Sequence, residues 1–151
     1  VIYGSVRYKG QWKDGVRHGH GVCVAENGEK YEGQWSEDRW HGQGKYMHSD
    51  GGSYEGEWQA HQKSGHGVEH WIDGAMYKGT FLNGLKHGTG LYRSGNGAQY
   101  EGQFDSDEMH GDGSYKFADG RVYHGQWKKG SMDGKAIMAW PNGSRYEGQY
   151  E

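Results

Sequence analysis

The chain has 151 residues, of which 30 are glycine and only 32% are apolar, so a globular core built mainly from aliphatic side chains is excluded. The net charge of -3 gives no overall attraction to nucleic acid, and no apolar run reaches the roughly 18 residues of a membrane-spanning helix. A single cysteine, Cys23, excludes a framework of internal disulfides and fits a reducing compartment.

A five-residue pattern, Tyr-x-Gly-x-aromatic, recurs every 23 residues without insertion or deletion. Its tyrosines are Tyr8, Tyr31, Tyr54, Tyr77, Tyr100, Tyr123 and Tyr146. A fixed period of this size predicts stacked repeats that each contact only their neighbours. We number the positions of every repeat from its tyrosine, as positions 1 to 23.

These repeats predict that residues 1–151 form one array. Residues 1–7 are expected to be the tail of a degenerate preceding repeat, and the array to be a piece of a longer protein. The full repeats are 8–30, 31–53, 54–76, 77–99, 100–122 and 123–145, followed by a partial repeat at 146–151.

Two strands are predicted in each repeat. Alternation across Tyr-x-Gly-x-Trp is the period-2 pattern of a strand with one aromatic face, and a second strand is expected over positions 13 to 18. Positions 20 and 21 are always Asn or Asp followed by Gly, which predicts the turn into the next repeat. About thirteen strands are therefore expected.

The register of that turn can be argued from the side chains. A two-residue loop would place position 17, which has no aromatic preference, opposite the next tyrosine. A three-residue loop at positions 19 to 21 places position 16 there instead, and this position includes Tyr46, Tyr92 and Tyr115. Pro141-Asn142-Gly143 suits a type I turn followed by a left-handed glycine, so the three-residue loop is predicted.

Glycine at positions 3 and 14 is expected on the aromatic face, where it lets rings lie flat against the backbone. The opposite face carries polar side chains such as Glu32 and Gln34. The predicted fold class is all-β: an elongated single-layer antiparallel β-meander, a solenoid of 23-residue hairpins forming a twisted rod.

The segments YEGQWSEDRWHGQGKY (31–46) and YKGTFLNGLKHGTGLY (77–92) resemble MORN (membrane occupation and recognition nexus) repeats, whose units read Tyr-x-Gly-x-Trp and then His-Gly-x-Gly. The resemblance extends over residues 8–151. It departs from the family pattern at Ser64 and Asp133, which stand in place of the histidine, and at Lys135-Ala136, which replaces x-Gly.

The resemblance implies a non-enzymatic protein in a cytoskeletal or membrane-associated assembly of the cytoplasm. Because the repeats fill the chain, a rod-like, self-associating scaffold is favoured, and a monomeric module that binds a partner helix or peptide is the alternative. The resemblance also implies homodimers formed through terminal repeats, and phosphoinositide binding. No helix follows the Gly-x-Gly pairs to complete a phosphate site, and no nucleophile and base are paired, so neither catalysis nor a cofactor is expected.

The first candidate site is an aromatic groove that would hold a helix or peptide of a partner protein. The alternative is that the same rings are simply the core. The rings are Tyr8, Trp12, Tyr31, Trp35, Tyr54, Trp58, Tyr77, Phe81, Tyr100, Phe104, Tyr123 and Trp127.

The second candidate is a basic row on the loop edge at positions 9 to 11, which would meet anionic phospholipid or an acidic partner. Its residues are Arg17, Arg39, Lys63 and Lys86. The alternative is a solvated row of loop charges, which Asp38 and Glu108 dilute.

The third candidate is a homodimer interface at the C-terminal end, where aliphatic residues replace glycine and aromatic residues and the last strand leaves an open edge. Its residues are Met109, Met132, Ile137, Met138, Trp140 and Tyr150. The alternative is a capping repeat. His18, His20 and Cys23 lie close in sequence, but they need not share a face, so no metal is predicted.

Overall fold

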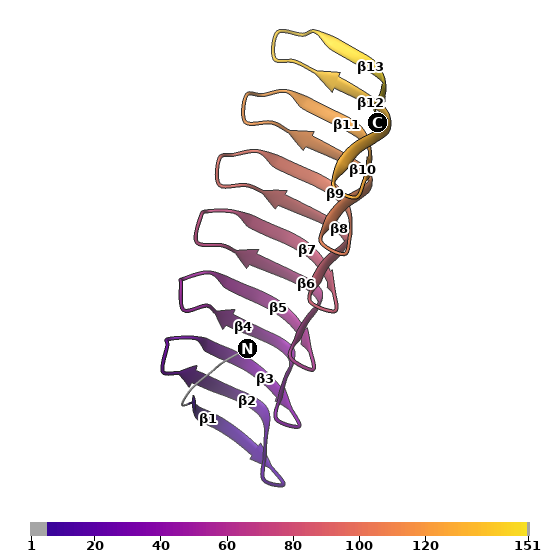
Figure 1. Ribbon diagram of the computed structural model, residues 1–151. Helices are drawn as coiled ribbons and strands as arrows, with labels where there is room; N and C mark the ends of the chain where they lie inside the picture. Colours follow the sequence, from indigo (N-terminus) through magenta and orange to yellow (C-terminus); the bar gives the residue numbers. More distant parts are fainter. Residues whose placement is uncertain (1–5, 151) are drawn as a thin grey trace.

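The fold is a ribbon of one β-sheet in which consecutive strands pair throughout. The computed structural model describes residues 6–150 and contains thirteen antiparallel strands in sequence order, drawn as a stack of hairpins in Figure 1. The strands are β1 (Val6–Lys13), β2 (Val16–Ala25), β3 (Lys30–Ser36), β4 (Arg39–Met47), β5 (Ser53–Gln59), β6 (Gln62–His70), β7 (Met76–Leu82), β8 (Leu85–Arg93), β9 (Gln99–Asp105), β10 (Glu108–Lys116), β11 (Val122–Lys128), β12 (Ser131–Ala139) and β13 (Arg145–Tyr150).

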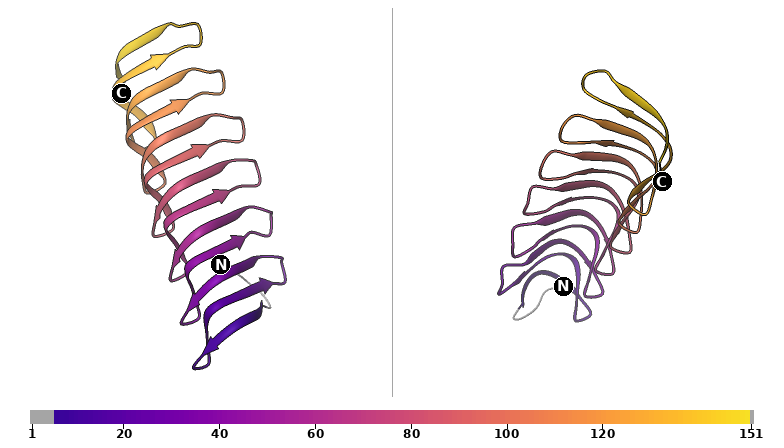
Figure 2. Two further views of the ribbon diagram at one scale, coloured as in Figure 1. Left: turned by 180° about the vertical axis from the view of Figure 1, so that it is seen from behind. Right: turned by 45° about the horizontal axis from the view of Figure 1, so that its top comes forward.

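This architecture confirms the predicted all-β single-layer meander. The ribbon twists along its length, and each hairpin is arched, as the view in the right panel of Figure 2 shows. Within residues 6–150 there is no helix of the length and apolarity needed to span a membrane. Residues 1–5 of the expected preceding repeat and the final Glu151 lie outside the described part of the chain.

The turn between repeats has the predicted three-residue loop. Position 16 pairs with the next tyrosine, as in Tyr46 opposite Tyr54, and Gly51 at position 21 has a φ of 101°. The backbone N–H of Gly51 donates to the carbonyl of His48, and the side chain of Asp50 accepts from the N–H of Gly52. The same side-chain bond recurs in all six turns, which explains why position 20 is always Asn or Asp.

The turn within each repeat lies elsewhere than predicted. The second strand begins at position 9 and not at position 13, so β4 starts at Arg39. The turn is a two-residue loop at positions 7 and 8 in which both residues have positive φ, for example Glu37 at 50° and Asp38 at 66°. Positive φ at both central residues is the geometry of a type I′ hairpin turn, which matches the twist of the strands it joins.

A bulge separates this turn from the rest of the hairpin. In the second repeat Gly33 pairs with Gly44 and Trp35 pairs with Trp40, so three residues of β4 oppose a single residue, Gln34, of β3. The side-chain oxygen of Gln34 accepts a hydrogen bond from the N–H of Gln43 at 2.7 Å. Because the strand pairs again beyond the bulge, the segment that the sequence assigned to a loop is strand.

The core consists of tyrosine rings lying on glycine. The hydroxyl of Tyr31 donates to the carbonyl of Gln34, which draws the ring across Gly33 and Gly44. A Cβ atom on Gly44 would lie 2.2 Å from the Tyr31 hydroxyl oxygen, so a side chain there would displace the ring. The predicted reason for glycine is therefore confirmed at position 14, whereas a Cβ atom at position 3, on Gly33, would first meet backbone atoms of Gln43 and Gly44. The face that carries these rings is called the inner face below.

The Ala60-His61 turn predicts a stabilising substitution. Ala60 has a φ of 47°, a conformation that asparagine tolerates and alanine does not. We expect Ala60→Asn to raise the free energy of unfolding by about 0.5–1 kcal/mol, measured by thermal and urea denaturation. Ala118 is an exposed turn residue without positive φ, so Ala118→Asn is the matched control and should give no gain. Equal effects of the two substitutions would contradict the strain argument.

Candidate protein-interaction face

The rings proposed as the groove are mostly core. The five tyrosines from Tyr31 to Tyr123 are fully buried, and their partners at position 5, such as Trp35 and Trp58, are at most 5% exposed. Each tyrosine meets an aromatic ring of its own repeat and one of the next repeat edge to face, at about 5 Å between centroids. The prediction that all twelve rings line an open groove is corrected: bending of each strand toward the inner face closes the rings on one another.

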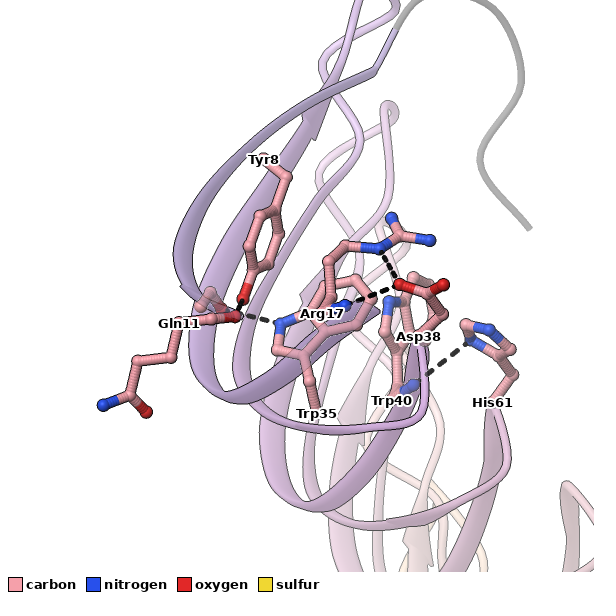
Figure 3. Close-up of polar contacts among 8 residues, drawn as sticks. Tyr8, Gln11, Arg17, Trp35, Asp38, Trp40 and His61 are labelled. Atoms are coloured by element: carbon pink, nitrogen blue, oxygen red, sulfur yellow. Dashed lines mark hydrogen bonds and ion pairs between the residues drawn. The ribbon is translucent and has the colours of Figure 1, made fainter. Parts of the chain in front are cut away.

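The two rings of the first repeat differ. Trp12 is 60% exposed and Tyr8 is half-buried, because no earlier strand of the described chain packs beside β1. Every later tryptophan at position 5 donates its indole N–H to a glycine carbonyl of the preceding repeat, as Trp35 does to Gly21 at 3.1 Å (Figure 3).

The basic residues lie in strands on the inner face and not in loops. Arg17, Lys63 and Lys86 all occupy position 10, directly opposite the aromatic residue of position 5. The Arg17 guanidinium stands 4.8 Å from the centre of the Trp35 ring, and the lysine ammonium groups stand 5.4–6.0 Å from the rings around them. Arg39, at position 9, is exposed. The predicted loop row is therefore corrected: three of its four cations fold over the core.

Each of these three cations also contacts a carboxylate. The Arg17 Nε lies 3.0 Å from the Asp38 carboxylate, and Lys63 and Lys86 pair with Glu69 and Asp107. The backbone N–H and the guanidinium of Arg17 both donate to Asp38 and hold the pKa of that carboxyl below its usual range (Figure 3). These pairs leave little uncompensated positive charge for an anionic lipid, whose binding stays a prediction.

Other inner-face side chains remain partly accessible. They come from positions 10, 16 and 18 of the third to sixth repeats and pack against the core without being covered by it. They are Trp71, Tyr92, Met109, Tyr115, Phe117 and Met132, called the aromatic row below. Sequence reasoning placed position 16 on the aromatic face, but of this row it selected only Met109 and Met132, as part of a dimer interface. The sequence feature that could have identified this row is the set of large apolar residues at positions 16 and 18 from Trp71 onward.

The second repeat has its own arrangement at position 10. Trp40 stacks on Tyr31 with the ring planes 4° apart and the centroids at 4.6 Å. An aromatic ring therefore lies where the first, third and fourth repeats have a cation. The hydroxyl of the neighbouring Tyr46 donates to the buried carboxylate of Glu29, which also accepts from the Asn27 side chain. The hydrogen bond from Tyr46 lowers the pKa of Glu29, so this carboxylate is ionised at neutral pH.

The residues proposed for a dimer interface do not share one surface. Met109, Met132 and Met138 pack into the inner face, and Met138 is only 6% exposed. Ile137 lies on the opposite face between His124 and Glu147. Trp140 is 37% exposed, and Tyr150 packs against Tyr123.

No metal centre is found within residues 6–150. No group of three or more His, Cys, Asp or Glu side chains in that range is arranged to hold an ion. Cys23 is buried, where burial raises the pKa of its thiol, whereas His20 is exposed on the opposite side of the strand.

The buried tyrosines predict a threshold for alkaline unfolding. Burial raises the pKa of Tyr77 and Tyr100 to about 12. A raised pKa in the folded state stabilises the protein fully below the unfolded value of about 10, and this contribution is lost as the pH rises from 10 to 12. We expect tyrosinate absorbance at 295 nm to rise in two steps, the second coinciding with loss of the β-sheet circular dichroism signal. Ionisation of all tyrosines near pH 10 with the fold intact would contradict this.

The fold and this face together define a class: an elongated repeat protein with one sheet, a self-filled ring core and a strip of accessible aromatic side chains. The model of the MORN repeat matches residues 8–30, 31–53, 54–76, 77–99, 100–120 and 123–145. The chain therefore belongs to the MORN-repeat family. No curated protein matches it in sequence.

One solved structure shares the fold at low sequence identity. The TCP domain of SAS-4 (dCPAP) from Drosophila melanogaster, in complex with a proline-rich motif of Ana2 (dSTIL), superposes with a TM-score of 0.54 at 15% identity. The match covers 87% of this chain and 72% of that one. The TCP10 domain of CPAP from Danio rerio, in complex with a STIL peptide, matches at 16% identity over 96% and 84% of the two chains, with a TM-score of only 0.24.

Proposed function

We propose that the chain is a protein-interaction module whose inner face binds a linear segment of a partner protein. The observation that carries this proposal is the aromatic row, since large apolar side chains left partly uncovered along one face are typical of binding surfaces. Membership of the MORN-repeat family supports an interaction role in general. The Drosophila domain of similar fold, solved with a proline-rich motif bound, is one instance of such a sheet holding a peptide.

The spacing of the row suits an extended peptide. Each repeat adds two strands, so equivalent side chains recur about every 10 Å along the rod. An extended peptide advances about 3.3 Å per residue, and every third residue would therefore meet an equivalent position. Trp71 and Phe117, both at position 18 and two repeats apart, and Tyr92 at position 16 of the repeat between them would then contact side chains of the peptide.

The test is a selection of random 16-residue linear peptides on the purified protein, followed by affinity measurement on variants. We expect Phe117→Ser and Tyr92→Ser to weaken the selected peptides at least tenfold, as loss of a buried aromatic anchor does. Leu91→Ser, on the opposite face of the strand that contains Tyr92, is the matched control and should leave affinity unchanged. Thermal melting of each variant separates lost binding from lost folding. Equal affinity for all three variants would reject the inner face as the binding surface.

Self-association into a rod-like scaffold is a second proposal. It is favoured by the partial exposure of two aromatic side chains in the last described hairpin, Tyr146 at 48% and Trp140 at 37%. Light scattering of the purified chain at high concentration should give twice the 17.0 kDa monomer mass. A mass of one chain at every concentration would defeat the dimer and leave the interaction module standing.

A further inference from the structure

Position 10 on the inner face carries a cation in all but one of the first four repeats. In three of them a cation of the chain itself lies over the tyrosine ring and meets a carboxylate: Arg17, Lys63 and Lys86. In the second repeat Trp40 takes this place. No cation of the second repeat therefore lies over its tyrosine.

A hollow of about 490 Å³ opens beside Trp40, large enough for a long side chain and part of its backbone. Its lining residues come from strands and turns of the second and third repeats, together with Glu29 of the first repeat and Gly84 of the fourth. Trp40 meets Trp58 and His61 edge to face at 5.1 and 5.0 Å, and Tyr46 meets His48 at 4.6 Å. The other lining residues are Glu29, Ser49, Asp50, Gln62, Lys63 and Gly84.

The charges around this hollow are predominantly negative. Glu29 is ionised and only 8% exposed, and Asp50 stands at the rim. The single lysine of the lining, Lys63, is neutralised by Glu69 at 2.8 Å. Burial lowers the pKa of His61, so this imidazole is neutral at pH 7 and adds no positive charge. Among residues 6–150, the lining thus holds two carboxylates beside aromatic walls, and its one lysine is already paired.

We infer that this hollow binds an arginine side chain of the partner segment. The inference rests on the proposed function, because it names the chemistry that one part of the inner face selects. A guanidinium would supply in trans the cation that Arg17, Lys63 and Lys86 supply within the first, third and fourth repeats. Cations are attracted to the faces of tryptophan and tyrosine rings, and their charge is offset by the carboxylates.

Arginine fits this site better than lysine. Its planar group can lie flat against an aromatic wall while its N–H groups fork toward a carboxylate, whereas an ammonium loses more hydration on entering. Acidic side chains would meet Glu29 and Asp50 and are excluded by repulsion.

The experiment uses the blocked tripeptide acetyl-Gly-Arg-Gly-amide, titrated into the isotope-labelled chain and followed by NMR. We expect saturable shifts of the indole N–H signals of Trp40 and Trp58, with a Kd on the order of 1 mM, as suits one side chain. The same tripeptide with citrulline, which has the shape of arginine without its charge, should bind at least fivefold more weakly. Equal binding of both peptides, or shifts confined to other parts of the chain, would overturn the inference.

Two variants and a matched control locate the site. Asp50→Asn keeps the side-chain oxygen that accepts from Gly52 but removes the charge, and it should weaken the arginine peptide about fivefold. Asp73→Asn makes the same change at the equivalent turn of the next repeat, outside the hollow, and should have no effect. Trp40→Lys installs the residue found at this position in two other repeats and should abolish binding. Equal weakening by the two aspartate variants would show nonspecific attraction and reject the site.

Failure of the arginine site can be distinguished from failure of the proposed function. If library peptides bind through Phe117 while the arginine tripeptide does not shift Trp40, the arginine site is wrong and the interaction face stands. If the tripeptide binds but no library peptide depends on Phe117 or Tyr92, the hollow exists without the extended interaction face.

Discussion

Gly33→Ala should unfold the second repeat or destabilise it by about 3 kcal/mol, the upper range for overpacking a core. A Cβ atom at Gly33 would lie 2.4 Å from the Gly44 Cα and 2.5 Å from the Gln43 carbonyl oxygen. Both obstacles are backbone atoms of the paired strand, so no side-chain rotation relieves them. Urea denaturation and hydrogen exchange of the β3 and β4 amides measure the loss.

The matched control for this prediction is another glycine without neighbours. Gly84 has a φ of 83° and no atom within 4 Å of a Cβ position, so Gly84→Asn should change stability by only a few tenths of a kcal/mol. The sixth repeat shows how the chain itself tolerates a methyl group: Ala136 occupies position 14 while its partner Gly125 stays glycine. If Gly33→Ala proved as mild as Gly84→Asn, close strand approach would not be what requires glycine at position 3.

Trp58→Ala should cost about 3–5 kcal/mol, the usual range for removing a large buried ring. The ring is 5% exposed, meets the rings of Tyr31, Trp40 and Tyr54, and donates its indole N–H to Gly44 at 3.0 Å. Because it joins two successive repeats, its removal should lower protection from hydrogen exchange in both.

Trp12→Ala makes the same substitution at the equivalent position of the first repeat. That ring is 60% exposed and, within residues 6–150, has one aromatic contact, to Tyr8, so we expect a loss within about 1 kcal/mol. Denaturation of both variants under the same conditions gives the comparison. Similar losses would mean that burial between repeats is not the source of stability.

Sequence reasoning succeeded for the turn between repeats. The aromatic side chains at position 16 and Pro141 predicted the three-residue loop of this turn, and with it the register between repeats. It failed for the turn inside each repeat, because pairs such as Glu37-Asp38 and Ala60-His61 carry no common type I′ signature. Those turns are held by the neighbouring repeat instead: the N–H of Asp38 donates to the Arg17 carbonyl, and that of His61 to the Trp40 carbonyl.

Sequence reasoning also assigned the right side chains to the aromatic face but not their exposure. Alternation along a strand predicts on which face of the sheet a ring lies, whereas the burial of the ring depends on how far the strand bends toward that face. The same limit applied to the charged residues. The sequence assigned Lys63 to a loop, and only its pairing opposite Trp58 shows that it covers the core.

The amino-acid sequence by itself determined the 23-residue period, the single antiparallel sheet, the glycine rows and the turn between repeats, because each follows from local conformational limits repeated in register. Only the tertiary structure decided which rings are core, where the inner turn lies and that a hollow opens beside Trp40. These features depend on the arch of the strands and on contacts between residues about 20 positions apart, which no local pattern encodes.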